Sequence, residues 1–135
     1  FNAGIIIGPG GDVILKYHKW HIPAWLGLGT SPHDVFDKYK KLVEKAKMAL
    51  LKGDIVTVGN LMNQNHKMLQ QVGVSGEIND KLVEMALENG AIGAKLTGTG
   101  RGGLVIGLAE NEDIQEKIVN ALEEKGFSAW RTTIG

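Results

Sequence analysis

Residues 90–103 read GAIGAKLTGTGRGG, an apolar run that passes into a loop of closely spaced glycines. A second apolar run, LVIGLA at 104–109, follows directly. Two short apolar runs on either side of a glycine-rich connection predict two strands joined by a loop. This stretch decides the fold, because it places paired strands over 91–97 and 104–109 after a long series of helix-like segments.

Helical periodicity precedes and follows this pair of strands. Ser31 and Pro32 are typical of a helix start, with Ser as the cap and Pro at the first helical position. Asp54 and Asn111 can cap two further helices, and glycines stand where the helices should end. We expect four helices, over 31–52, 54–72, 76–89 and 111–125.

Both ends of the chain are predicted to add strands. Residues 3–8 and 13–17 are β-branched runs separated by a Pro-Gly-Gly-Asp turn, which indicates a β-hairpin. Residues 127–134 indicate a final strand. The resulting order, β-hairpin, three helices, then β-β-α-β, is typical of an α+β domain. We therefore expect a mainly antiparallel, four-stranded, ferredoxin-like sheet with the helices packed on it.

The composition of the 135 residues is that of a globular domain, with 43% hydrophobic and 22% charged residues. A formal net charge of +0 provides no field that attracts nucleic acid or an anionic membrane. No apolar run approaches the roughly 18 residues of a membrane span. Because cysteine is absent, disulfides, thiolate metal sites and cysteine nucleophiles are excluded, which fits a cytoplasmic protein.

The glycine-rich loop is the main candidate for a binding site. Gly98, Gly100 and Gly103 match the G-x-G-x-x-G pattern, but a dinucleotide fingerprint needs a helix after the loop and here a strand follows. Consecutive backbone N–H groups of such a loop can form a nest for phosphate, to which Arg101 could add charge. A glycine-rich hairpin without a ligand fits the residues equally well.

Other polar residues give weaker signals. His18 and His21 have a spacing that would face opposite sides of a strand, so we expect no metal site there. Asn63 and His66 share one helix face, as either a functional polar cluster or a solvated surface. The lysine-rich helix over 38–52 lacks interleaved aromatic residues, which favours a solvated face over nucleic-acid binding.

Residues 59–66, 69–75 and 90–103, which occur in order, resemble the mevalonate kinases of the GHMP kinase family over about 39–135. The resemblance implies the C-terminal domain of a two-lobed enzyme that phosphorylates mevalonate with ATP and Mg²⁺ in isoprenoid biosynthesis. It implies no catalytic residue in this chain. It places at the phosphate and ATP site the residues Lys95, Thr97, Gly98, Thr99, Gly100, Arg101, Gly102 and Gly103.

Residues 1–38 resemble a different family, the nitrilase or carbon–nitrogen hydrolase superfamily. Lys19 falls where that family keeps its catalytic lysine, but the family also needs a cysteine nucleophile, which this chain lacks. We therefore expect a recombined or engineered chimera with a junction near 37–41. The hairpin is then expected to complete the sheet of the 39–135 part, so that both parts fold as one domain.

The part of the chain that resembles the kinases does not include their N-terminal lobe, which carries the catalytic groups of that family. We expect the chain alone to be inactive and to bind ATP and Mg²⁺ weakly at best, with mevalonate and ATP bound only if the missing lobe is supplied. The alternative is a structural module with no ligand, and a nitrilase-like remnant is a third reading. Unpaired sheet edges predict a homo-oligomer, with no nucleic-acid or membrane partner.

Overall fold

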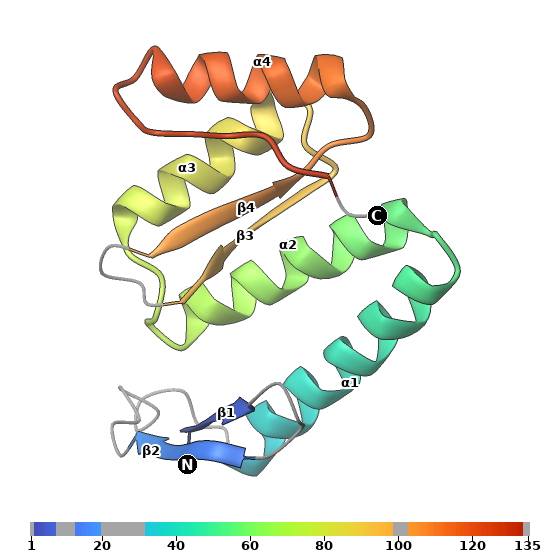
Figure 1. The fold of residues 1–135 in the computed structure, drawn as a ribbon, viewed down its shortest axis with the longest axis vertical. Coiled ribbons are helices and arrows are strands. Elements are labelled where there is room, and N and C mark those ends of the chain that lie inside the picture. The colour runs from blue at the N-terminus through green and yellow to red at the C-terminus, as the bar shows by residue number, and fades with distance from the viewer. Residues whose placement is uncertain (1, 8–12, 20–31, 99–102, 134–135) are drawn as a thin grey trace.

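The structure is a computed structural model that describes residues 2–7, 13–19, 32–98 and 103–133. Within these ranges the chain forms helices and strands in the order shown in Figure 1. The bounds are β1 (Asn2–Ile7), β2 (Val13–Lys19), α1 (Pro32–Leu51), α2 (Ile55–Gln71), α3 (Glu77–Glu88), β3 (Gly93–Thr97), β4 (Leu104–Leu108) and α4 (Glu112–Glu123).

The helices confirm the sequence-based prediction, because their ends depend on local interactions. The Asp54 carboxylate accepts a hydrogen bond from the Thr57 N–H at 3.0 Å and starts α2. The Asn111 side chain accepts one from the Ile114 N–H at 3.0 Å and starts α4. At the other end of α2 the chain turns through Gly73, whose φ of 68° is costly for any residue with a side chain.

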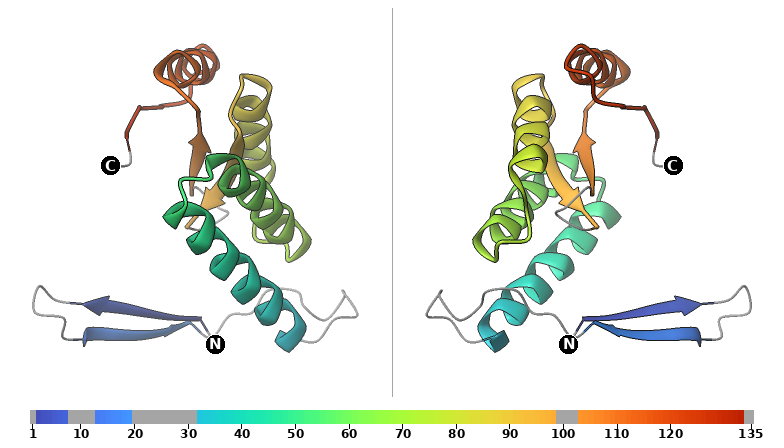
Figure 2. Two further views of the ribbon diagram at one scale, coloured as in Figure 1. Left: turned by 90° about the vertical axis from the view of Figure 1, so that its right-hand side faces the viewer. Right: turned by 90° about the vertical axis from the view of Figure 1, so that its left-hand side faces the viewer.

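The strands form two separate two-stranded sheets in the described part of the chain. Strand β3 pairs with β4 in antiparallel register, with Lys95 opposite Ile106. Strand β1 pairs with β2, also antiparallel. Figures 1 and 2 show the β1–β2 hairpin apart from β3 and β4, at the end of the structure where α1 begins. The predicted four-stranded sheet is therefore not confirmed.

Two steps of the sheet prediction need correction. The hairpin does not complete the β3–β4 sheet, because it lies near the opposite end of α1 from that sheet (Figure 1). The strand expected over 127–134 is absent from its described part, 127–133. No described strand pairs with that segment, although it lines one cavity together with β4, and Gln115 Nε2 donates to its Thr132 carbonyl at 3.2 Å.

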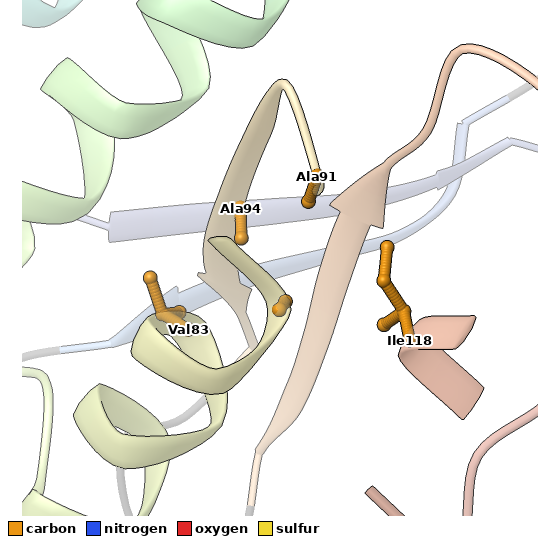
Figure 3. Packing of buried hydrophobic residues seen from close by; sticks show 5 residues of the cluster. Val83, Ala91, Ala94 and Ile118 are labelled. Atoms are coloured by element: carbon orange, nitrogen blue, oxygen red, sulfur yellow. The ribbon is translucent and has the colours of Figure 1, made fainter. Parts of the chain in front are cut away.

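The core lies where α3 and α4 pack on the β3–β4 pair. Figure 3 shows Val83 of α3, Ala91 and Ala94 beside and within β3, and Ile118 of α4 converging on one volume. Burying such apolar side chains is the main stabilising term, at roughly 25 cal/mol per Å² removed from water. The small alanines allow α3 to approach the strands closely.

Helix α1 contributes little to this core, because it lies against α2 and leaves much of its apolar surface in solvent (Figure 1). Ala49 is buried, but Val43 is 61% exposed and Leu51 is 73% exposed. None of the helices in the ranges described is long and apolar enough to cross a membrane.

Candidate functional site

Helix α2 and strand β3 touch backbone to backbone at two glycines, directly before the candidate loop. A Cβ atom placed on Gly93 would lie 2.2 Å from the carbonyl oxygen of Gly59. A Cβ atom placed on Gly59 would lie 2.6 Å from Cγ2 of Ile92 and 2.8 Å from its carbonyl carbon. Real side chains do not approach this closely, so both positions require glycine.

This close approach lets side chains of α2 bond the edge of β3 that faces away from β4. The amide of Asn63 donates to the Ile92 carbonyl at 3.2 Å and accepts from the Ala94 N–H at 2.9 Å. One turn further along α2, Nδ1 of His66 accepts from the Leu96 N–H at 3.4 Å. We call this set of contacts, made by Asn63 and His66 to alternate residues of β3, the edge seal.

The sequence left two interpretations of Asn63 and His66 open, a functional polar cluster or a solvated surface, and the edge seal replaces both. Their shared face is neither solvated nor a free catalytic cluster, since His66 is only 4% exposed and both side chains are used by the backbone of β3. An unpaired backbone group in a buried position costs about 1–3 kcal/mol. The two side chains therefore position β3, and with it the start of the glycine-rich loop.

A second contact of His66 reaches helix α3. Its Nε2 atom lies 3.1 Å from Oδ1 of Asp80, an ion-pair distance without the alignment of a hydrogen bond. The hydroxyl of Ser75 donates to the same Asp80 oxygen. Because Nδ1 accepts from Leu96, the neutral ring carries its proton on Nε2, facing Asp80.

Burial lowers the pKa of His66 below its ordinary value, and Lys95 adds to that effect, while Asp80 opposes it. The neutral ring is therefore the form that the fold prefers. Protonation of Nδ1 would also remove the acceptor for the Leu96 N–H. The structure thus ties the protonation state of one buried histidine to the edge seal.

This arrangement predicts that acid destabilises the domain through His66. A lowered pKa in the folded state contributes stability above the unfolded pKa of about 6.5, and that stability is lost as the pH falls below this value and through the lower pKa of the folded state. We expect the melting temperature of the wild type to exceed that of His66→Gln at pH 7.5, and the gap to narrow by pH 5.5. Calorimetry at both pH values checks this, and a gap that does not change with pH would contradict it.

The glycine-rich loop begins where the edge seal ends. Gly98 follows β3 with a φ of 85°, a conformation that favours glycine. Thr97 pairs with Leu104 across the base of the loop, and Gly103 is partly buried beside β4. Four of the candidate residues lie outside the described residues: Thr99, Gly100, Arg101 and Gly102. The structure therefore gives the positions of Gly98 and Gly103, at the two ends of the predicted phosphate-binding loop.

Two further predicted residues lie on strands, Lys95 on β3 and Lys19 on β2. Lys95 lines an apolar groove between α1 and α2, where burial lowers its pKa. Lys19 ends β2, opposite Asn2 in the separate hairpin. Across the described ranges, no group of three His, Asp or Glu residues is placed to hold a metal ion.

The α+β order of elements and the glycine-rich β3–β4 connection match a known class of protein. Residues 46–128 match the family model of the GHMP kinase C-terminal domain, and the chain belongs to that family. Among its relatives, the mevalonate kinase of Pyrococcus abyssi is 36% identical over 105 residues, which are 74% of this chain and 31% of that protein. The galactokinase of Clostridium acetobutylicum is 35% identical over 100 residues, which are 73% of this chain and 25% of that protein.

The comparison with solved structures gives the same class of protein as the comparison of sequences. The crystal structure of L. major mevalonate kinase in complex with R-mevalonate superposes with a TM-score of 0.65 and 41% identity, covering 69% of this chain and 28% of that one. This chain is thus a GHMP kinase C-terminal domain similar to the mevalonate kinases. It spans about a third of the length of these relatives.

Proposed function

We propose that this chain is the C-terminal domain of a kinase that transfers a phosphoryl group from ATP to mevalonate. The observation that carries the proposal is the strand–glycine–strand unit of 93–108, which the edge seal holds in place and whose sequence resembles the mevalonate kinases. The similarity of most of the chain to mevalonate kinases supports the choice of substrate. The similarity to a galactokinase makes galactose the competing substrate to test.

Under this proposal the chain supplies phosphate contacts rather than the whole reaction. Gly98 and Gly103 fix the ends of a loop whose backbone N–H groups can bind the phosphate oxygens of ATP. Under this proposal the Mg²⁺ ligands and the catalytic groups lie outside the C-terminal domain, in the other lobe that the resemblance to the kinases implies. Phosphoryl transfer depends on positioning and charge neutralisation from all of these parts.

The proposal predicts that the chain alone does not phosphorylate mevalonate, and that a completed kinase does. We would replace the matching C-terminal segment of the P. abyssi enzyme with residues 46–128 and assay the hybrid with mevalonate and with galactose. We expect turnover with mevalonate only. Gly98→Val should lower kcat by about 100-fold, because a misplaced loop loses its alignment with the phosphates.

The exposed Lys67→Ala variant is the matched control and should keep the activity of the hybrid. Turnover by the isolated chain, or a folded hybrid that phosphorylates galactose in place of mevalonate, would contradict the proposal. A folded hybrid with no kinase activity would favour the alternative, a structural module without a ligand. The nitrilase-like origin of residues 1–38 and the chimeric junction stay predictions, and Lys19 without a cysteine supports no hydrolase activity.

We also propose that copies of this chain associate through strand β4. In the part of the chain that is described, β4 pairs only with β3, and Leu104 and Ile106 are 47% and 45% exposed. A strand edge without a paired neighbour is a template for pairing with another strand. We expect sedimentation equilibrium to show dimers at high concentration, and Ile106→Lys to return the protein to monomers. A wild type that stays monomeric would refute this proposal.

A further inference from the structure

A groove between helices α1 and α2 has a composition that the kinase activity does not explain. Its volume is about 580 Å³, within the range of small-molecule sites, roughly 300–1,000 Å³. The walls are apolar, with Leu42, Ala46 and Leu50 from α1 facing Val58 and Met62 from α2. The groove therefore combines the volume of a small-molecule site with mainly apolar walls.

The charged residues of the groove are both lysines. Lys47, Asn65 and Lys95 line it together with the apolar walls, and no aspartate or glutamate is among its described lining residues. Lys95 is partly buried and forms no ion pair with any residue of the described ranges. A partly buried charge without an ion-pair partner loses part of its hydration, so an anion that reaches this ammonium group would be bound more favourably than at a solvated lysine.

We propose that this groove binds an amphipathic carboxylate, with its alkyl chain between α1 and α2 and its carboxylate on Lys95 and Asn65. The ammonium of Lys95 and the amide of Asn65 provide one charge and one neutral donor, which matches the two oxygens of a single carboxylate. The burial that lowers the pKa of Lys95 also excludes water from such a pair, which strengthens it.

The proposal goes beyond the proposed kinase activity, since it concerns a carboxylate in place of ATP, at a groove whose described lining includes neither Gly98 nor Gly103. A phosphate head group carries a second charge, which Lys95 alone does not neutralise and which would also need Lys47 of α1. A neutral alkyl ligand would leave Lys95 unpaired. These differences in charge separate the ligands in an experiment.

The test is a titration of the full chain with decanoate, decanol and decyl phosphate, followed through the amide chemical shifts of α1 and α2 below the concentration at which the ligands aggregate. We expect decanoate to shift these amides and to bind at least about tenfold more tightly than decanol, as one charge-assisted hydrogen bond would require. Lys95→Met should weaken decanoate binding by the same factor, and Lys95→Arg should keep it within about threefold.

Lys67→Met removes an exposed lysine of α2 outside the groove, and it should bind decanoate like the wild type. Equal binding of decanol and decanoate, equal binding by Lys95→Met, or no shift in α1 and α2 would each overturn the proposal. Tighter binding of decyl phosphate than of decanoate would overturn the choice of a carboxylate. If Lys95→Met does not fold, Asn65→Leu takes its place, and unchanged decanoate binding by that variant would contradict the proposed head-group contact.

Discussion

Replacing Gly93 with alanine is expected to destabilise the domain more than any other single methyl group added to a described position. The new Cβ would lie 2.2 Å from the Gly59 carbonyl oxygen and 2.5 Å from the Gly59 Cα. The obstacle is backbone on a helix and not the end of a flexible side chain, so α2 would have to move off β3. That movement would also break the hydrogen bonds of the edge seal.

The expected loss for Gly93→Ala is about 3 kcal/mol or more, above the usual effect of overpacking. For a domain of this size, that loss lowers the melting temperature by about 12 °C or more. Gly107→Ala is the matched control on the neighbouring strand, because its Cβ would meet only Ala86 at 3.7 Å and Ala91 at 3.9 Å. Thermal unfolding of both variants checks the prediction, and equal melting temperatures for the two would contradict it.

Asn63→Leu should produce the second largest loss of stability. The leucine fills much of the same space but leaves the Ile92 carbonyl and the Ala94 N–H without partners. Each such group costs about 1–3 kcal/mol, so a loss of about 2–5 kcal/mol is expected. Urea unfolding measures the free energy directly, and the slope of the transition shows whether the folded state has loosened.

The matched control for Asn63→Leu is Gln64→Leu, the same change at the next residue of α2, which is exposed. Its effect should stay within about 0.5 kcal/mol, as is usual for surface positions. Hydrogen exchange adds a local readout, since the Ala94 amide should exchange faster in Asn63→Leu than in the control. Equal protection of the Ala94 amide in both variants would show that Asn63 does not hold this edge.

The helices could be predicted from the sequence because the decisive interactions are local. Asp54 reaches the N–H of Thr57, three residues on, and Asn111 does the same for Ile114. The strand-like residues Ile55 and Val58 open a helix all the same, because Asp54 caps it and the helix packs on its neighbours. The pairing of β3 with β4 was also predictable, since only the short glycine-rich connection separates the two strands.

The sheet as a whole could not be predicted in the same way. Whether a hairpin joins another sheet depends on contacts between residues far apart in sequence, and the β-propensity of 3–8 and 13–17 fixes only their pairing with each other. The contact of Gly59 with Gly93 is of the same kind, because 34 positions separate the two glycines. The i, i+3 spacing of Asn63 and His66 revealed a shared face but not the strand that this face covers.

The edge seal makes the two outer edges of the β3–β4 pair different, because only the β3 edge is bonded by a neighbouring helix. This difference limits how many copies can be added to an assembly through strand pairing. On the β3 side, α2 already occupies the backbone donors and acceptors, while β4 has no second strand beside it in the described structure. A fibril needs two open edges on every subunit so that each added copy presents a new one. The β3–β4 pair has one such edge, so the association that we propose through β4 would use it in the first pairing and would leave no edge of this pair for a third copy.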